Sequence, residues 1–180
     1  MNRPYLFPDN TVLCNFAAVD RLQLLQDTLD GRGRWVEAIA YEARTSSRHH
    51  PALSRIEYEG WLGVPIEIDT TAEIRQVETI RRTVFGGLAR RPRAHLGEAQ
   101  TCHVILNRAE LRGSHWISDD QEAVCYASRQ GIPTRQTAGL MQEAVARELI
   151  DPDKAWDVLM DMLQEERHIR MPATADELFG

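Results

Sequence analysis

The sequence has 180 residues, 43% hydrophobic and 27% charged, a composition typical of one globular domain and not of a disordered chain. The net charge of −6 argues against a protein that binds nucleic acid through overall basicity. No apolar run approaches the roughly 18 residues of a membrane span, and MNRPYLFPDN lacks a signal-peptide layout, so we expect a cytoplasmic protein. Cys14, Cys102 and Cys125 form no C-x-x-C pair and are expected to be buried free thiols.

The first half of the chain alternates short apolar runs with helical patterns. The run at residues 4–8 ends at Asp9, and apolar residues then recur at helical spacing until Gly31, which predicts a strand, a turn and one or two helices. Residues 35–36 are expected to form a second short strand before a helix over 37–43, and residues 64–68 alternate like a third. Thr70 and Glu73 form a capping box before an apolar stripe of Ile74, Val77, Ile80, Val84 and Phe85.

The second half continues the same alternation. A helix is predicted from Glu98 to 111, a strand over 115–118, and helices over 121–130 and 137–149. Asp151 should cap a further helix with Pro152 at its first position, and Thr174 with Glu177 indicates one last turn. The inner face of the helix after Asp151 is expected to be Ala155, Trp156, Leu159, Met162 and Leu163. Short strands between helices imply right-handed crossovers and a parallel sheet covered on both faces, in one domain over residues 1–180.

Acidic residues follow two of the predicted strands. Asp9 ends the first strand, and Asp119 with Asp120 ends the strand HWIS. In an open parallel sheet the ligand site lies beyond the carboxyl ends of the strands, so these acids are candidates for one site. Each of them could instead cap the helix that follows, and this alternative stays open for Asp120 in particular.

Two further acids lie on helix faces that should point inward. Glu42 shares a face with Ala38 and Ile39, and Glu98 shares one with Cys102 and Ile105. A buried carboxylate is costly unless a cation or a donor compensates it, and the alternatives are an arginine partner for each acid or one shared metal ion. Four acids without histidine or cysteine suit Mg²⁺ or Mn²⁺, which usually serve phosphoryl chemistry by activating water.

Basic residues are concentrated in one window, residues 81–97, which contains no acid. Arginine supplies all the basic side chains of the chain except Lys154. Because the window precedes Glu98, its arginines are candidates for holding RNA phosphates beside the metal, and a merely solvated loop is an equal alternative. The candidate arginines are Arg81, Arg82, Arg90, Arg91 and Arg93.

The order of these acids resembles the PIN-domain nucleases, in particular the VapC-like toxin ribonucleases. The matching pieces are LFPDNTVLCNFA, WVEAIAYEA, HLGEAQTCHV and WISDDQEAVCYASRQGIP, followed by TRQTAGLMQEAVARELID as the segment after the last strand. No single piece is specific, but four in order over nearly the whole chain are informative. The resemblance implies a three-layer α/β/α sandwich with a central parallel sheet and C-terminal helices over 137–180.

The resemblance also implies a function and roles for the matched residues. It implies an endoribonuclease that cleaves by a metal-activated water, with Mg²⁺ or Mn²⁺ at Asp9, Glu42, Glu98 and Asp119. Asp120 is a further candidate metal ligand, and Asn10 and Thr11 are expected to orient the ligand oxygens. A cognate antitoxin and a homodimer are the expected partners besides RNA. Two departures are a longer segment over residues 44–95 and Gln100, where some relatives carry an acid.

Other readings of these motifs fit less well. A haloacid-dehalogenase phosphatase would need an acid where Thr11 stands, a response-regulator receiver would need a lysine near the last strand, and a P-loop would need G-x-x-x-x-G-K. The main competitor is a PIN-like domain without turnover that binds RNA or protein. In that case Trp156, Met160 and Met162 could form a dimer or antitoxin surface instead of core.

Overall fold

A parallel sheet of three short strands lies at the centre of the computed structural model, which describes residues 3–180. Strands β1 (Leu6–Pro8), β2 (His115–Ile117) and β3 (Thr134–Arg135) are ordered β1-β2-β3, with Phe7 paired to Trp116 and Ile117 to Arg135. Every residue of β1 and two of the three residues of β2, Trp116 and Ile117, are buried, as expected for a parallel sheet that is covered on both faces.

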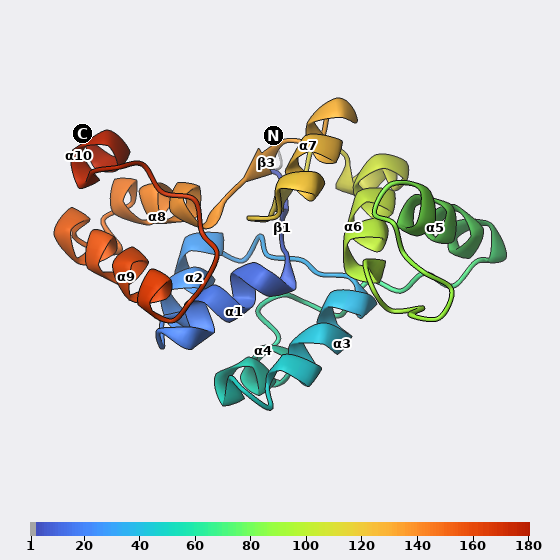
Figure 1. The fold of residues 1–180 in the computed structure, drawn as a ribbon, viewed down its shortest axis with the longest axis horizontal. Helices are drawn as coiled ribbons and strands as arrows, with labels where there is room; N and C mark the ends of the chain where they lie inside the picture. Colours follow the sequence, from blue (N-terminus) through green and yellow to red (C-terminus); the bar gives the residue numbers. More distant parts are fainter. Residues whose placement is uncertain (1–2) are drawn as a thin grey trace.

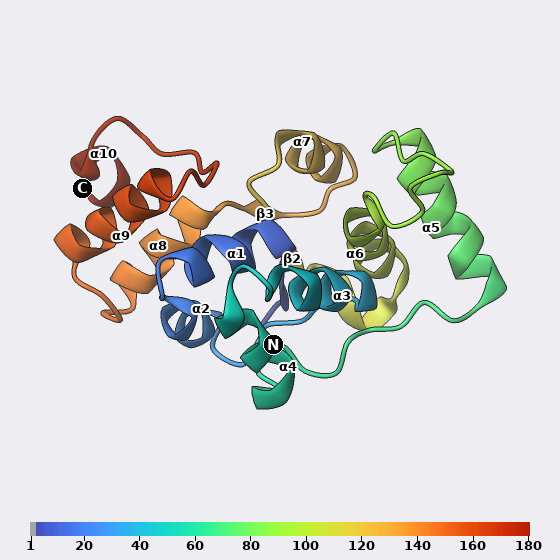
Figure 2. The ribbon, with the colours of Figure 1, turned by 60° about the horizontal axis from the view of Figure 1, so that its bottom comes forward.

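Helices cover the sheet on both sides, and the predicted α/β/α fold class is confirmed. Figures 1 and 2 both show α2, α8 and α9 on one side of the strands and α5 and α6 on the other. The helices are α1 (Asn10–Ala18), α2 (Leu22–Leu29), α3 (Glu37–Ser46), α4 (Ser54–Glu59), α5 (Thr71–Thr83), α6 (Leu96–Asn107), α7 (Gln121–Arg129), α8 (Thr137–Ala146), α9 (Pro152–Gln164) and α10 (Ala175–Phe179), with short 3₁₀ turns η1 (Pro51–Leu53) and η2 (Ala109–Leu111).

The predicted helix starts are confirmed by their capping hydrogen bonds. The Thr70 side chain accepts a hydrogen bond from the Glu73 backbone at the start of α5, and Asp151 does the same for Asp153 at the start of α9. Thr174 caps α10 in the same way. Each cap satisfies a backbone N–H that has no partner inside its helix, which is why the sequence signal locates these ends well.

The predicted strand over residues 64–68 is wrong. Val64 is 86% exposed, and this segment makes only a single bridge, from Ile66 to Val36. Pro65 lacks an N–H group, so it cannot donate to a strand ladder. The short strand predicted at residues 35–36 is reduced to the same single bridge.

Three predicted burials are also wrong. Ile74 and Leu163 are 51% and 40% exposed, because α5 and α9 lie at opposite ends of the molecule and each buries only part of its surface (Figure 1). Cys125 is exposed, whereas Cys14 and Cys102 are buried free thiols as expected. No helix among residues 3–180 combines the length and apolarity needed to cross a membrane.

Candidate active site

Asp9 lies where β1 passes into α1, against the end of β2. Its backbone N–H donates to the Ile117 carbonyl over 2.9 Å, so the parallel pairing of the strands fixes where this carboxylate stands. Ser118, which follows β2 and is fully buried, donates from Oγ to Asp9 Oδ2 over 3.2 Å. The Asp9 residue is only 6% exposed.

Glu42 and Glu98 come together through the close packing of α3 against α6. Gly97 makes this approach possible, because a Cβ at this position would clash with Ile39 Cδ1 and lie 3.2 Å from Glu42 Oε1. Glu98 stands in the first turn of α6, where a negative charge also interacts favourably with the helix dipole. Its Oε1 lies 3.2 Å from His95 Nδ1.

Asp9, Glu42 and Glu98 interact electrostatically. Burial, followed by repulsion from Glu98, raises the pKa of Asp9 to about 7, against its hydrogen bond from Ser118. Burial, followed by repulsion from Asp9 and Glu98, raises the pKa of Glu42 to about 8. These three acids, from three separate elements, therefore form one cluster, which we call the acid cluster.

No arginine neutralises the acid cluster. The ion pairs among residues 3–180 include none between an arginine or lysine and Asp9, Glu42, Glu98 or Asp119. The arginine partner that the sequence left open for Glu42 and Glu98 is therefore absent from this part of the chain. Within the described part of the chain, His95 is the one potentially cationic side chain that forms an ion-pair contact with the cluster.

Asp119 is satisfied differently, by neutral donors alone. Its carboxylate accepts hydrogen bonds from Asn15 Nδ2 (2.9 Å), from the Thr137 backbone N–H (3.0 Å) and from Thr137 Oγ1 (2.5 Å). Burial raises the pKa of Asp119 although these three donors oppose the shift. The three donors fix the position of the side chain and partly offset the effect of burial on its charged form.

Asp120 caps a helix, as the sequence allowed. Its Oδ1 accepts from the backbone N–H groups of Glu122 (2.7 Å) and Ala123 (3.1 Å) at the start of α7. The same carboxylate still adds to the repulsion on Asp9. A role for Asp120 as a metal ligand stays a prediction.

The predicted orienting residues reach different partners. Asn10 donates from Nδ2 to Ser46 Oγ over 3.1 Å, which ties the start of α1 to the end of α3. Thr11 is half-buried in the first turn of α1. Gln100 is buried and bridges α6 to the start of α3, by accepting from the Ala38 backbone and donating to Glu37.

Sequence reasoning missed the residues that hold Asp119 in place. Asn15 and Thr137 are fully buried, and Asn15 Oδ1 also accepts from Arg167 Nε over 2.9 Å, which brings the segment after α9 to this site. A polar Asn15 within an apolar helical stripe was the available signal, because a buried amide needs partners. Nothing in the sequence indicates that Arg167, 152 residues away, supplies one of them.

The side chains as placed do not form a ready-made metal site. Within residues 3–180, no group of three or more His, Cys, Asp and Glu side chains could hold a metal ion. The chemistry of the donor set nevertheless fits a hard divalent cation, because the acid cluster offers only oxygen atoms, is partly desolvated and has no guanidinium partner. A cation would relieve the repulsion that raises the pKa values of Asp9 and Glu42.

The prediction that Arg81 binds RNA is wrong. Its side chain is only 1% exposed. Its guanidinium forms an ion pair with Glu78 and donates hydrogen bonds to three backbone carbonyls. Arg82, Arg90, Arg91 and Arg93 are exposed. Their contact with RNA stays a prediction.

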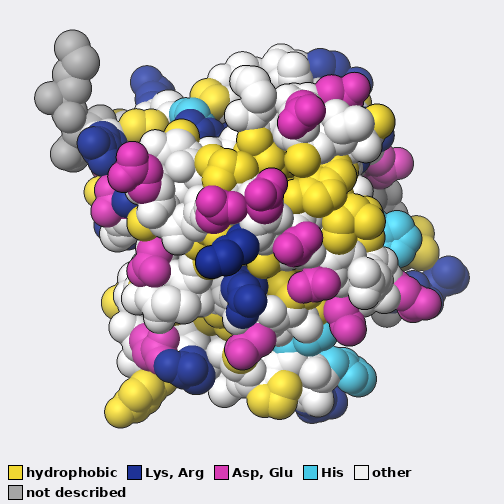
Figure 3. All heavy atoms as spheres, turned by 90° about the vertical axis from the view of Figure 1, so that its left-hand side faces the viewer, with side chains coloured by type: hydrophobic (Ala, Val, Ile, Leu, Met, Phe, Trp, Pro, Cys, Tyr) yellow, Lys and Arg dark blue, Asp and Glu magenta, His cyan; other side chains and the backbone are white. Residues whose placement is uncertain are grey.

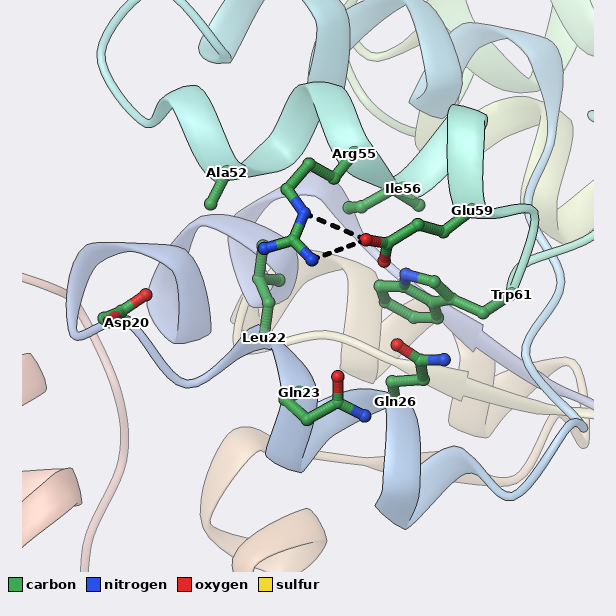
Figure 4. Close-up of a pocket in the computed structure, with 9 residues that line it drawn as sticks. All are labelled: Asp20, Leu22, Gln23, Gln26, Ala52, Arg55, Ile56, Glu59 and Trp61. Atoms are coloured by element: carbon green, nitrogen blue, oxygen red, sulfur yellow. Dashed lines mark hydrogen bonds and ion pairs between the residues drawn. The ribbon is translucent and has the colours of Figure 1, made fainter.

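One surface hollow of about 230 Å³ lies away from the acid cluster (Figure 4). It is lined by α2, η1 and α4, with Trp61 at one side, and Arg55 is already paired with Glu59 across it. None of the predicted acids lines this hollow. Its one other charged side chain is Asp20, so the hollow lacks the group of carboxylates that the predicted chemistry needs.

Comparison with known proteins gives one match. A family model described as "DUF3368: PIN domain" matches residues 7–177. No curated protein and no solved structure gives a significant match. The matched range begins before Asp9 and ends after α9, so it includes every acid of the site.

Proposed function

We propose, since the chain belongs to the PIN-domain family, that it is an endoribonuclease that hydrolyses RNA phosphodiesters with the help of Mg²⁺ or Mn²⁺. PIN domains are generally nucleases, which supports the reaction class. The observation that carries the proposal is the acid cluster, whose buried or partly buried carboxylates repel one another and have no arginine partner among residues 3–180. Such an arrangement costs stability, which a bound cation would recover.

Asp9, Glu42, Glu98 and Asp119 are the residues that would hold the metal. When bound, the ion would activate water and neutralise charge on the phosphate that is attacked. Within the chain, Ser118 orients Asp9, and Asn15 with Thr137 orients Asp119. Because this chemistry does not require the RNA 2′-hydroxyl, preference for RNA must come from the shape of the binding surface.

In its more specific form, the proposal is that the protein is a cytoplasmic toxin. It would form a homodimer and be bound by a cognate antitoxin. The face at the left of Figure 1 supports it, since hydrophobic and acidic side chains lie next to one another there (Figure 3). On α9, Met160 is 38% exposed and Leu163, one turn later, is 40% exposed. Met162 is fully buried and Trp156 packs partly against the core, so these two contribute to the interior and not mainly to a partner surface.

The alternative is a PIN domain without turnover that binds RNA or protein. The observation that favours it is that the side chains of residues 3–180 do not already form a group that could hold a metal. In that case the acids would have only a structural role. A divalent ion would then neither change the stability of the protein nor lead to cleavage of RNA.

The test is incubation of the purified protein with a mixed RNA pool, in Mn²⁺ or in EDTA, followed by mapping of the cut ends. We expect cutting in Mn²⁺ only, and none by Asp9→Asn prepared in the same way. Cutting in EDTA, or equal cutting by Asp9→Asn, would contradict the mechanism. No cutting of any RNA under any condition would favour the alternative.

A further inference from the structure

The loop between α5 and α6, residues 84–95, is fixed to α5 by a buried arginine. Arg81 donates from Nη1 to the carbonyls of Arg91 and Ala94, each over 3.2 Å, while its Nε and Nη2 bind Glu78. Gly87 packs directly on this guanidinium, since a Cβ there would lie 2.5 Å from Arg81 Nη1. A loop held through its own carbonyls presents its remaining side chains in defined positions.

Arg93 is the side chain of this loop that reaches α3. Its guanidinium carbon lies 3.8 Å from the centroid of the Tyr41 ring, in the geometry of a cation–π pair. Tyr41 is 39% exposed and Arg93 is exposed as well, so the pair lies at the surface. An aromatic ring exposed to this extent and covered by an arginine is not needed for the core.

The Tyr41–Arg93 pair is close in sequence to acids of the cluster on both of its elements. Tyr41 immediately precedes Glu42 on α3, and two residues after Arg93 the loop reaches His95, which contacts Glu98. His95 has a left-handed backbone (φ 61°), a conformation that a residue other than glycine adopts only where the surroundings hold it. The same rigid loop thus connects the exposed pair with the acids.

We propose that Tyr41 and Arg93 form a stacking site for a base of single-stranded RNA, which places the adjoining phosphate at the acid cluster. A planar guanidinium that covers a ring with one face can stack on a base with the other, and its N–H groups can bind phosphate. The bases of a duplex are stacked on one another, so only a single strand or a loop can supply such a base. This inference rests on the proposed function for the identity of the strand as substrate.

Binding is measured first in EDTA, where metal-dependent cutting does not occur, by fluorescence anisotropy with a labelled single-stranded RNA of mixed sequence. We expect Arg93→Ala and Tyr41→Leu each to weaken binding about 10-fold, and Tyr41→Phe to bind like wild type. Arg93→Lys should also weaken binding, because lysine keeps the charge but has no planar face. The double variant Tyr41→Leu with Arg93→Ala should lose little more than either single variant, since the two residues act as one unit.

Arg112 is the control, an exposed arginine outside this loop and outside the candidate RNA-binding residues. Arg112→Lys should bind like wild type, and a double-stranded RNA should not distinguish Tyr41→Leu from wild type. Equal binding by wild type, Arg93→Lys and Tyr41→Leu would overturn the stacking site. Circular dichroism of each variant checks that the fold is kept.

The second readout is cutting in Mn²⁺, where Tyr41→Leu should raise KM more than it lowers kcat. If Mn²⁺-dependent cutting is present but the Tyr41 and Arg93 variants bind and cut like wild type, the stacking site fails and the proposed function stands. If no RNA is cut while the binding pattern holds, the proposed function fails and the stacking site stands.

Discussion

Poorly exposed carboxylates in this molecule have two opposite kinds of surroundings: some form ion pairs with arginine and others do not. Glu143 on α8 lies between Arg32 and Arg135 and forms an ion pair with both. Asp9, Glu42 and Glu98 pair with no arginine or lysine among residues 3–180, although the chain contains 20 arginines. The difference does not follow from exposure, because the side chain of Glu98 in the acid cluster and that of Glu143 are both 18% exposed.

This difference distinguishes acids that stabilise the fold from acids that destabilise it. The Glu143 pairs join α8 to β3 and to the segment after α2, so they hold elements of the structure together. The acid cluster instead brings like charges together from β1, α3 and α6, which costs free energy. Residues of the second kind are typical of functional sites, where activity is obtained at the expense of stability.

The largest expected effect distinguishes the two groups by activity. Asp9→Asn should lower RNA cutting in Mn²⁺ by at least about 100-fold, because a metal ligand is lost while the shape of the side chain is kept. Glu143→Gln should retain cutting within about 3-fold when both proteins are folded, yet lose stability by about 1–3 kcal/mol, because two arginines are left without their carboxylate. Initial cutting rates and urea unfolding measure the two effects. An equal loss of activity in both variants would contradict the distinction between a functional Asp9 and a structural Glu143.

Gly97→Ala tests whether the approach of α3 and α6 matters. The added Cβ would clash with Ile39 Cδ1 and crowd Glu42 Oε1, so either the side chains of Ile39 and Glu42 or α6 itself must shift. We expect cutting to fall about 10-fold or more, since small misplacements of reacting groups are costly, and stability to fall by about 1–3 kcal/mol. Gly131→Ala is the control, because Gly131 has a positive φ in a turn that is remote in sequence and an added Cβ there would meet no neighbouring atom. This variant should lose stability through backbone strain but keep its cutting rate. Full activity of folded Gly97→Ala would show that the spacing of Glu42 and Glu98 is unimportant.

The pH dependence of stability should reveal the cost of burying these carboxylates, to which their mutual repulsion adds. The pKa of Asp9 is raised from 3.8 to about 7 and that of Glu42 from 4.5 to about 8, so between these values the folded state holds protons that the unfolded chain releases. Stability from these groups is therefore fully present below about pH 4 and is lost as pH rises to about 8. In EDTA at pH 8.5, Asp9→Asn should be more stable than wild type by on the order of 2 kcal/mol, or about 4–8 °C in Tm. The two proteins should converge at pH 4, and a constant difference across this range would contradict the raised pKa of Asp9.

The smallest expected effect concerns the hydrogen bond to Asp9. Ser118→Ala removes the donor of Asp9 Oδ2 and the acceptor of the Asp120 N–H, so cutting should fall about 3- to 10-fold with a stability loss of about 1 kcal/mol. Ser54→Ala, on the exposed surface of α4, is the matched control and should change neither quantity appreciably. An unchanged cutting rate in Ser118→Ala would remove Ser118 from the orienting role.

Much of the fold was predictable because its signals are local. Caps such as Thr70 and Asp151 satisfy nearby backbone groups, and the buried runs that contain Phe7 and Trp116 are typical of parallel strands. The segment that contains Val64 was misread because alternation alone does not reveal that a strand partner is missing. Packing at a distance decides that outcome.

The acids of the candidate site were predictable from position and order, whereas their surroundings were not. Asp9 follows a strand and Glu42 faces inward, and these features are visible in the sequence. The donors to Asp119 come from Asn15 and Thr137, at separations of 104 and 18 residues, and no spacing rule connects them. Arg81 was misassigned because charge indicates a surface side chain, while its burial depends on three carbonyls of the following loop.

The most direct test of the central claim is the binding of Mn²⁺ to the wild-type protein, measured by isothermal titration calorimetry in parallel with Asp9→Asn, Glu42→Gln and Glu143→Gln. The acid cluster predicts saturable binding by wild type and by Glu143→Gln, and at least about 10-fold weaker binding by the other two variants. Equal binding by all four proteins, or none by wild type at millimolar Mn²⁺, would contradict the claim that these carboxylates are placed to share a divalent ion.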